Sequence, residues 1–150
     1  MSKCNTFEAD VLKLVFQALP IANIADNAAS GALSALYISL HTASPTDSPN
    51  SQQSQSEVAY TNYARVGVLR NGSNWQVVTD GGGTTEASNL LEVLFPQCGA
   101  TGATATHFGV GTLASGSGKL LYHGALNSPL AISTGITPRF APGALKVRED

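Results

Sequence analysis

The spacing of apolar residues is helical near the N-terminus and strand-like further along the chain. In residues 5–19, "NTFEADVLKLVFQAL", one narrow stripe at about 100° per residue holds the polar side chains Asp10, Lys13 and Gln17. Asn5, with Glu8 three residues later, has the spacing of a capping box, in which side chains bind the free N–H groups of the first turn. Pro20 ends the pattern. The sequence therefore predicts a helix over residues 5–19.

The apolar side chains of this helix cover more than half of its circumference, which is wider than packing on a single core requires. The helix is either buried deeply in its own domain, or it contacts both its own domain and a neighbouring subunit. The second interpretation predicts a protein interface made of Phe7, Val11, Leu12, Leu14, Val15, Phe16 and Leu19. Residues 20–35 are small and mostly unpatterned, so we expect an arm or linker there.

From residue 36 onward the apolar period is two, as in β-strands. In "LYISLH" (36–41) the aliphatic residues alternate with Tyr37, Ser39 and His41, which is typical of a half-buried strand. Further strands are predicted, between segments rich in Gly, Ser, Asn and Pro, at residues 63–70, 75–79, 89–95, 106–111, 119–126, 130–133 and 145–148. This spacing indicates a mainly β fold, an antiparallel β-sandwich that is jelly-roll-like. We expect residues 1–34 to form an N-terminal α-helix and arm, and residues 35–150 to form the sandwich domain.

Two features of the predicted β domain are candidates for recognition. The polar loop "TASPTDSPNSQQSQS" (42–56) is long enough to suggest functional contact or mobility. Aromatic side chains are candidates for a sugar-binding or stacking platform, although core filling explains single aromatic residues more often, and they are Tyr37, Tyr60, Tyr63, Trp75 and Tyr122.

The composition is that of a folded chain with few charges. Hydrophobic residues make up 43% of the 150 residues, which excludes general disorder, whereas charged residues make up only 12%, about half the usual share. A surface of this kind often meets other protein. The net charge is −2, and no basic cluster predicts binding to nucleic acid. Cys4 and Cys98 form no CxxC pair and are expected to be free thiols from a reducing compartment. No apolar run of 18 residues predicts a membrane span, and no secretory signal is recognised.

The stretch "HFGVGTLASGSGKLLYHG" (107–124) holds five glycines and resembles a phosphate-binding loop at first sight. A Walker loop that contained Gly118 and Lys119 would need glycine at position 113 and a hydroxyl residue at position 120, but both positions hold leucine. The segment 109–114 matches GxGxxG/A formally, but a strand-like segment follows it instead of a helix. We therefore predict a β-hairpin with a Gly/Ser turn at residues 114–118 and no nucleotide cofactor.

Other groups of potentially reactive residues give equally weak evidence for a catalytic or metal site. The three histidines, His41, His107 and His123, lie on separate predicted strands without a metal-ligand spacing. Nothing in the sequence pairs two of the acidic candidates for glycoside hydrolysis, which are Asp47, Glu57, Asp80, Glu86 and Glu92. A GxSxG nucleophile motif is absent. The sequence predicts no catalytic residue, no metal site and no cofactor, and hence a protein that is not an enzyme.

Four spaced segments resemble a family of small virion proteins of tailed bacteriophages. These segments are "LYISLHTASP", "SEVAYTNYARV", "ATHFGVGTLASGSGKLLYHGAL" and "LAISTGITPRFAPGAL", and the resemblance covers about residues 35–147. Members of this family are labelled as capsid decoration (cement) proteins or as tail-fibre proteins. The resemblance implies a β-sandwich or jelly-roll-like body without catalysis or cofactor, made in the host cytoplasm, that binds other virion proteins. "TDSPNSQQSQS" stands where related chains carry an acidic, glycine-containing turn, so the resemblance assigns no role to this loop.

Two functions remain open at this point. The leading hypothesis is a capsid decoration protein, expected as a homodimer, that binds the major capsid protein on the outer surface of the head and stabilises it. Residues 5–19 would then carry much of the dimer or capsid contact. The alternative is a receptor- or glycan-binding module of a tail fibre, although neither coiled-coil heptads nor a shaft repeat is present. Neither hypothesis involves nucleic acid or a membrane.

Overall fold

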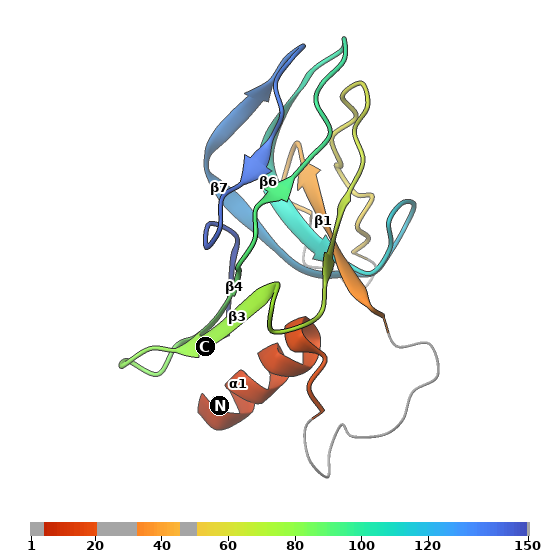
Figure 1. Cartoon of the computed structure of the whole chain (residues 1–150). Coiled ribbons are helices and arrows are strands. Elements are labelled where there is room, and N and C mark those ends of the chain that lie inside the picture. Colours follow the sequence, from red (N-terminus) through yellow and green to blue (C-terminus); the bar gives the residue numbers. More distant parts are fainter. Residues whose placement is uncertain (1–4, 21–32, 46–50, 150) are drawn as a thin grey trace. The chain divides into compact units, whose positions relative to one another are not determined.

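The computed structural model of the chain describes residues 5–20, 33–45 and 51–149, without the side chains of residues 5–7 and 149. Its elements are α1 (Asn5–Leu12), the π-helical turn η1 (Lys13–Gln17), β1 (Ala35–His41), β2 (Val66–Leu69), β3 (Trp75–Thr79), β4 (Thr85–Asn89), β5 (Val93–Leu94), β6 (Ala103–Gly111), β7 (Leu120–Ile132), β8 (Arg139–Phe140) and β9 (Lys146–Glu149) (Figure 1). The mainly β, antiparallel class with one N-terminal helix is confirmed and is consistent with a β-sandwich. The jelly-roll-like arrangement stays a prediction. Among the described residues, no helix is long and apolar enough to cross a membrane.

The chain forms two compact units, and each gathers segments that are far apart in the sequence. Unit 1 consists of Met1–Ser34, Leu69–Val93 and Phe140–Asp150. Unit 2 consists of Ala35–Val68 and Leu94–Arg139. The division into residues 1–34 and 35–150 stays a prediction about independently folding parts.

Unit 1 contains the helix and a three-stranded antiparallel sheet in the order β3-β4-β9. α1 contacts β3 and β4, and η1 contacts β3. Phe16 and Trp75 are fully buried, and their ring centroids lie 4.6 Å apart in an edge-to-face arrangement that favours aromatic pairs. Gln17 Nε2 donates a hydrogen bond of 3.1 Å to the carbonyl of Trp75. The helical segment is therefore part of the core of its own unit.

Arg70 binds the C-terminal end of this helical segment. Its guanidinium donates to the carbonyls of Val15 at 2.5 Å, Leu14 at 2.6 Å and Leu33 at 2.8 Å. Carbonyls in the last turn of a helix lack partners within the helix, and a cation there also interacts favourably with the helix dipole. Burial lowers the pKa of Arg70 from its ordinary value. The segment ends at Ala18, whose φ of 57° is left-handed.

Unit 2 is built on a four-stranded sheet in the order β2-β1-β6-β7 (Figure 1). β1 pairs with β6 in antiparallel register from Tyr37↔Gly111 to His41↔His107, and β7 pairs with the other edge of β6. The prediction that β1 is half-buried is wrong, because Ser39 and His41 are as fully buried as the leucines of the opposite face. The polar face of this central strand is covered by protein.

Four strand predictions differ from the structure. β4 and the short β8 were not predicted, and the run 89–95 is not a single strand, because β4 ends at Asn89 and β5 begins at Val93. The buried residues of β4 are Thr85, Ala87 and Asn89. Because two of these three are polar, the sequence shows no alternation of apolar and polar residues there. The runs 119–126 and 130–133 belong to the single strand β7, which continues past a register shift against β6.

Candidate functional site

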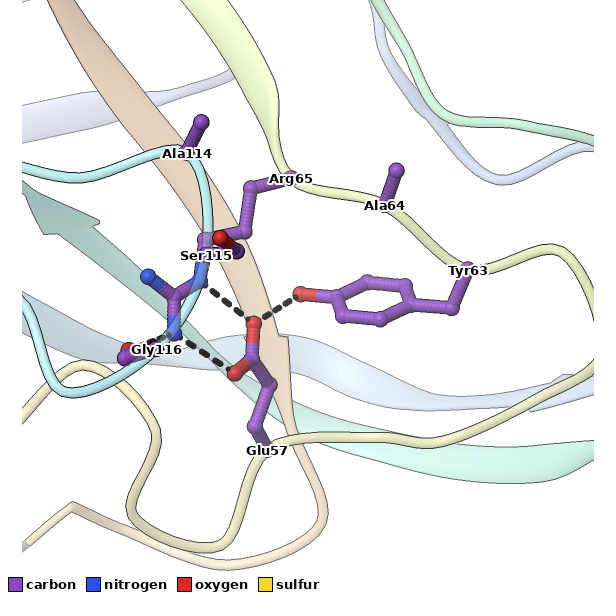
Figure 2. A pocket seen from close by; sticks show the side chains of 7 residues that line it. All are labelled: Glu57, Tyr63, Ala64, Arg65, Ala114, Ser115 and Gly116. Atoms are coloured by element: carbon purple, nitrogen blue, oxygen red, sulfur yellow. Dashed lines mark hydrogen bonds and ion pairs between the residues drawn. The ribbon is translucent and has the colours of Figure 1, made fainter.

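A pocket of about 240 Å³ lies in unit 2 beside the turn between β6 and β7 (Figure 2). Its lining comes from three segments of the chain, and the residues are Glu57, Tyr63, Ala64, Arg65, Ala114, Ser115 and Gly116. Glu57, Tyr63 and Arg65 point toward one another and are joined by hydrogen bonds and an ion pair. These three side chains carry the strongest concentration of polar chemistry in unit 2.

Arg65 and Glu57 form a bidentate ion pair. Arg65 Nε lies 2.7 Å from Glu57 Oε1, and Arg65 Nη2 lies 2.7 Å from Glu57 Oε2. The side chains are only 2% and 16% exposed, respectively, so little water screens the pair. Tyr63 donates its hydroxyl to Glu57 Oε1 at 2.7 Å and accepts the N–H of Leu40 at 3.2 Å. The hydrogen bonds that Arg65 donates to Glu57 raise the pKa of Arg65, and burial raises the pKa of Tyr63.

The remaining donors of Arg65 hold the turn between β6 and β7. Nη1 donates to the carbonyl of Leu113 at 2.9 Å and to Gln53 Oε1 at 3.2 Å, and Nη2 donates to the carbonyl of Gly116 at 2.7 Å. With the two bonds to Glu57, all five N–H donors of the guanidinium have partners. We call this arrangement, formed by Arg65, Glu57 and Gln53, the arginine clamp.

Gln53 explains why the turn segment is rich in glycine. Its side chain is fully buried, and its Nε2 donates to the carbonyl of Tyr37 at 2.6 Å. A Cβ atom on Gly111 would collide with the amide of Gln53, and one on Gly118 would lie 3.0 Å from its Oε1. The glycines therefore admit a buried amide. Two carbonyls of the turn face a cation, whereas a phosphate loop directs its N–H groups at an anion.

The clamp positions an exposed loop and leaves little polar capacity for a ligand. Every donor of Arg65 is used within the protein, and Glu57 Oε1 already accepts two hydrogen bonds. Above the clamp, Leu113 is 49% exposed, and the four exposed residues that follow it, 114–117, are small and uncharged, whereas the exposed Lys119 ends the turn. The arrangement is suited to presenting a fixed surface to another protein.

The three histidines lie on three separate strands, as predicted, and on one face of the unit 2 sheet. His41 is the register partner of His107, and His123 is the partner of Gly109. His41 Nδ1 lies 2.8 Å from the carbonyl of Gln55, which can only accept, so Nδ1 carries the proton. Nε2 then accepts from the hydroxyl of Ser39 at 2.8 Å. Both ring nitrogens are engaged, and the described residues contain no group of three or more side chains that could hold a metal.

Two of the acidic candidates, Asp80 and Glu86, line a pocket of about 250 Å³ in unit 1, and both are bonded within the protein. Glu86 binds Lys146 and Arg148, each at 2.8 Å. The pKa of Glu86 is lowered because the bonds to these two cations outweigh the effect of burial. Asp80 Oδ1 accepts the N–H groups of Gly82 and Thr84 and so holds a turn. Asp47 lies outside the described residues.

The predicted interface residues of the helical segment divide by exposure. Leu12 and Phe16 are fully buried within unit 1, Leu19 is 50% exposed, and those of intermediate exposure are Val11, Leu14 and Val15. The side chain of Phe7 lies outside the described part of the chain. An interface on this segment would therefore use the partly exposed residues and Leu19, and it stays a prediction.

Several predicted candidates meet at this site, although for chemistry other than that predicted. Tyr63 of the aromatic candidates and Glu57 of the acidic candidates line the pocket, and Gln53 of the loop 42–56 belongs to the clamp. Trp75 and Tyr60 are buried, and the hydroxyl of Tyr60 donates to the carbonyl of Pro96 at 2.8 Å.

Neither Arg65 nor the grouping of these residues around it was predicted from the sequence. Cys98 is a free, buried thiol, and Cys4 lies outside the described residues.

The chain matches a known protein family. A family model described as "Podophage GP4 fiber I protein gp80" matches residues 15–148 and so extends over most of both units. None of the curated proteins compared with the chain matches it.

The first prediction compares two Arg–Glu pairs of similar length that differ in burial. Arg65→Met should lower the free energy of unfolding by about 3–5 kcal/mol, because Glu57 and two turn carbonyls lose their partner. Arg148→Met should change it by less than about 1 kcal/mol, because the Arg148 side chain is 64% exposed. Urea unfolding of both variants measures the difference. Equal losses would contradict the clamp.

The second prediction concerns the pH dependence of stability. Burial lowers the pKa of His41 from its ordinary value of 6.5, and Arg65 and His123 lower this pKa further. Glu57 acts in the opposite direction and raises it. The unfolded chain therefore binds a proton more readily than the folded chain, so the free energy of unfolding should fall as the pH drops below 6.5, by at most about 1.4 kcal/mol per pH unit. Urea titrations at about pH 5 to 8 measure the slope.

The His41→Gln variant is the control for this pH dependence. It is less stable overall, but its stability should vary less between about pH 5 and 6.5, where the lowered pKa of Glu86 keeps that carboxylate ionised. An unchanged slope in the variant would assign the pH dependence to other groups.

Proposed function

The chain belongs to the podophage GP4 fiber I protein gp80 family, and we propose that it is a component of a phage fibre that works by binding other virion proteins. The observation that carries this proposal is the family match over residues 15–148. The family description supports a structural role in a phage virion and suggests that this role is not enzymatic. The assignment to the fibre is the finer step that the proposal adds.

The geometry of unit 2 supports binding as the mode of action. A saturated, nearly buried ion pair cannot readily exchange its partners for a substrate, but it holds the turn above it in one conformation. A loop that is ordered before binding loses less conformational entropy when a partner docks. The exposed Leu113 and its uncharged neighbours fit a protein surface better than a charged ligand.

Capsid decoration is the second candidate, and the exposed Leu19 beside the partly exposed apolar residues of the helical segment favours it. A protein that binds only the assembled shell stabilises the shell by its free energy of binding. Many copies on a symmetric surface would add their contributions. The partners would be the major capsid protein and a second copy of the chain.

Immunogold labelling of purified particles separates the two candidates. We expect labels at the fibres, with none on particles from a phage that lacks the gene. Labels spread evenly over the head would contradict the fibre proposal and support capsid decoration. The result does not depend on which surface of the chain makes the contact.

The third prediction tests the apolar end of the helical segment. Leu19→Gln should weaken rebinding to particles that lack the protein about tenfold, as for a typical interface hot spot. Leu91→Gln is the matched control, because the two leucines are 50% and 57% exposed and neither substitution disturbs a core. Co-sedimentation of each purified variant with such particles measures binding. Equal binding by both variants would exclude Leu19 from the contact.

A further inference from the structure

Strand β7 forms an edge of the unit 2 sheet. It runs from Leu120 to Ile132 and is the longest of the described strands, and in the order β2-β1-β6-β7 its only neighbour is β6 (Figure 1). The outer side of an edge strand carries backbone N–H and C=O groups that can pair with another strand. Proteins usually protect such an edge with charges, proline, bulges or short length.

Irregularities protect both ends of β7 and leave one regular stretch between them. From Tyr122 to Ala125 the strand is in continuous register with β6, opposite Val110 to His107. Before this stretch the register shifts between Val110 and Gly111, and an isolated bridge joins Lys119 to Gln52. After it, residues 126–129 lie opposite the single residue 106, and Pro129 lacks a backbone N–H. Residues 122–125 therefore remain as the regular stretch of edge without proline.

The charge pattern of β7 favours a second copy of the same chain as its partner. None of its thirteen residues is Asp, Glu, Lys or Arg. When a strand pairs antiparallel with its own copy across a two-fold axis, residues of one segment face residues of the same segment. Like charges placed opposite each other are destabilising, and β7 avoids this penalty in every register. A strongly charged partner would find no complementary charge on this strand.

The opposite edge of the sheet is less suited to strand addition. β2 has only four residues, Val66–Leu69, and it lies between Arg65 and Arg70. Pairing of β2 with β7 of the next copy would form an open filament, whereas pairing of β7 with β7 closes after two copies. The uncharged edge of β7 favours the closed arrangement.

We propose that residues 122–125 of β7 pair antiparallel with the same residues of a second copy, joining two four-stranded sheets across a two-fold axis. Backbone hydrogen bonds provide the main contact, as in other cases of strand addition. The proposal is independent of where the protein sits in the virion, because it concerns only the self-association of the isolated chain.

The experiment uses the full chain and two lysine substitutions in the same strand. Ala125 and Ala131 are both exposed, but only Ala125 lies in the proposed pairing segment. Ala125→Lys introduces a charge into each of the paired strands and should raise the dissociation constant of the dimer about tenfold. Ala131→Lys should leave it unchanged. Analytical ultracentrifugation over a range of concentrations measures the association of a chain of 15.4 kDa.

Hydrogen exchange provides a second measurement that does not depend on substitution. Raising the protein concentration should slow amide exchange within residues 122–125 and leave residues 126–132 of β7 unaffected. A chain that stays monomeric at every concentration would overturn the proposal. So would a dimer that Ala125→Lys and Ala131→Lys weaken equally, provided that circular dichroism shows both variants to be folded.

Discussion

A buried guanidinium is costly unless every N–H donor has a partner, and this requirement governs the polar interior of unit 2. Arg65 satisfies it with one carboxylate, one side-chain amide and two backbone carbonyls. These partners come from two segments of the chain, residues 53–57 and the turn at residues 113–116. The glycines at 111 and 118 follow from the same requirement, because Gln53 reaches the guanidinium only where no Cβ stands in its way. The clamp is thus the reason that the turn between β6 and β7 has one shape.

A second arginine organises unit 1 in a related way. Arg70 binds three carbonyls and joins the end of the helical segment to the chain at Leu33. The described partners of Arg70 are neutral, whereas Arg65 has Glu57. Arg65 and Arg70 lie just before and just after β2, so one short strand carries the principal polar anchor of each unit. Only 12% of the residues are charged, and two of the few arginines bind other groups of the protein in its interior.

The use of charges inside the protein leaves surfaces that are mostly neutral. Residues 113–117 of the turn above the clamp, the end of the helical segment at Leu19 and β7 itself carry no charged side chain. Neutral surfaces of this kind suit contacts with neighbouring protein molecules in an assembly better than recognition of a charged ligand. This distribution agrees with the structural role that the phage fibre family supports, and it accounts for the weak chemical signals in the sequence.

The order of apolar and polar residues was enough to predict the helical segment, the strands at 36–41 and 75–79, the antiparallel β class and the absence of a phosphate loop at 107–124. These features depend on local periodicity or on motif spacing, which a single sequence displays. The clamp depends on contacts between residues up to 51 positions apart, so no local pattern marks Arg65. The burial of Ser39 and His41 likewise follows from the central position of β1 in its sheet. Tertiary structure decided these features, because whether a polar side chain is buried depends on which distant segments can satisfy its hydrogen bonds.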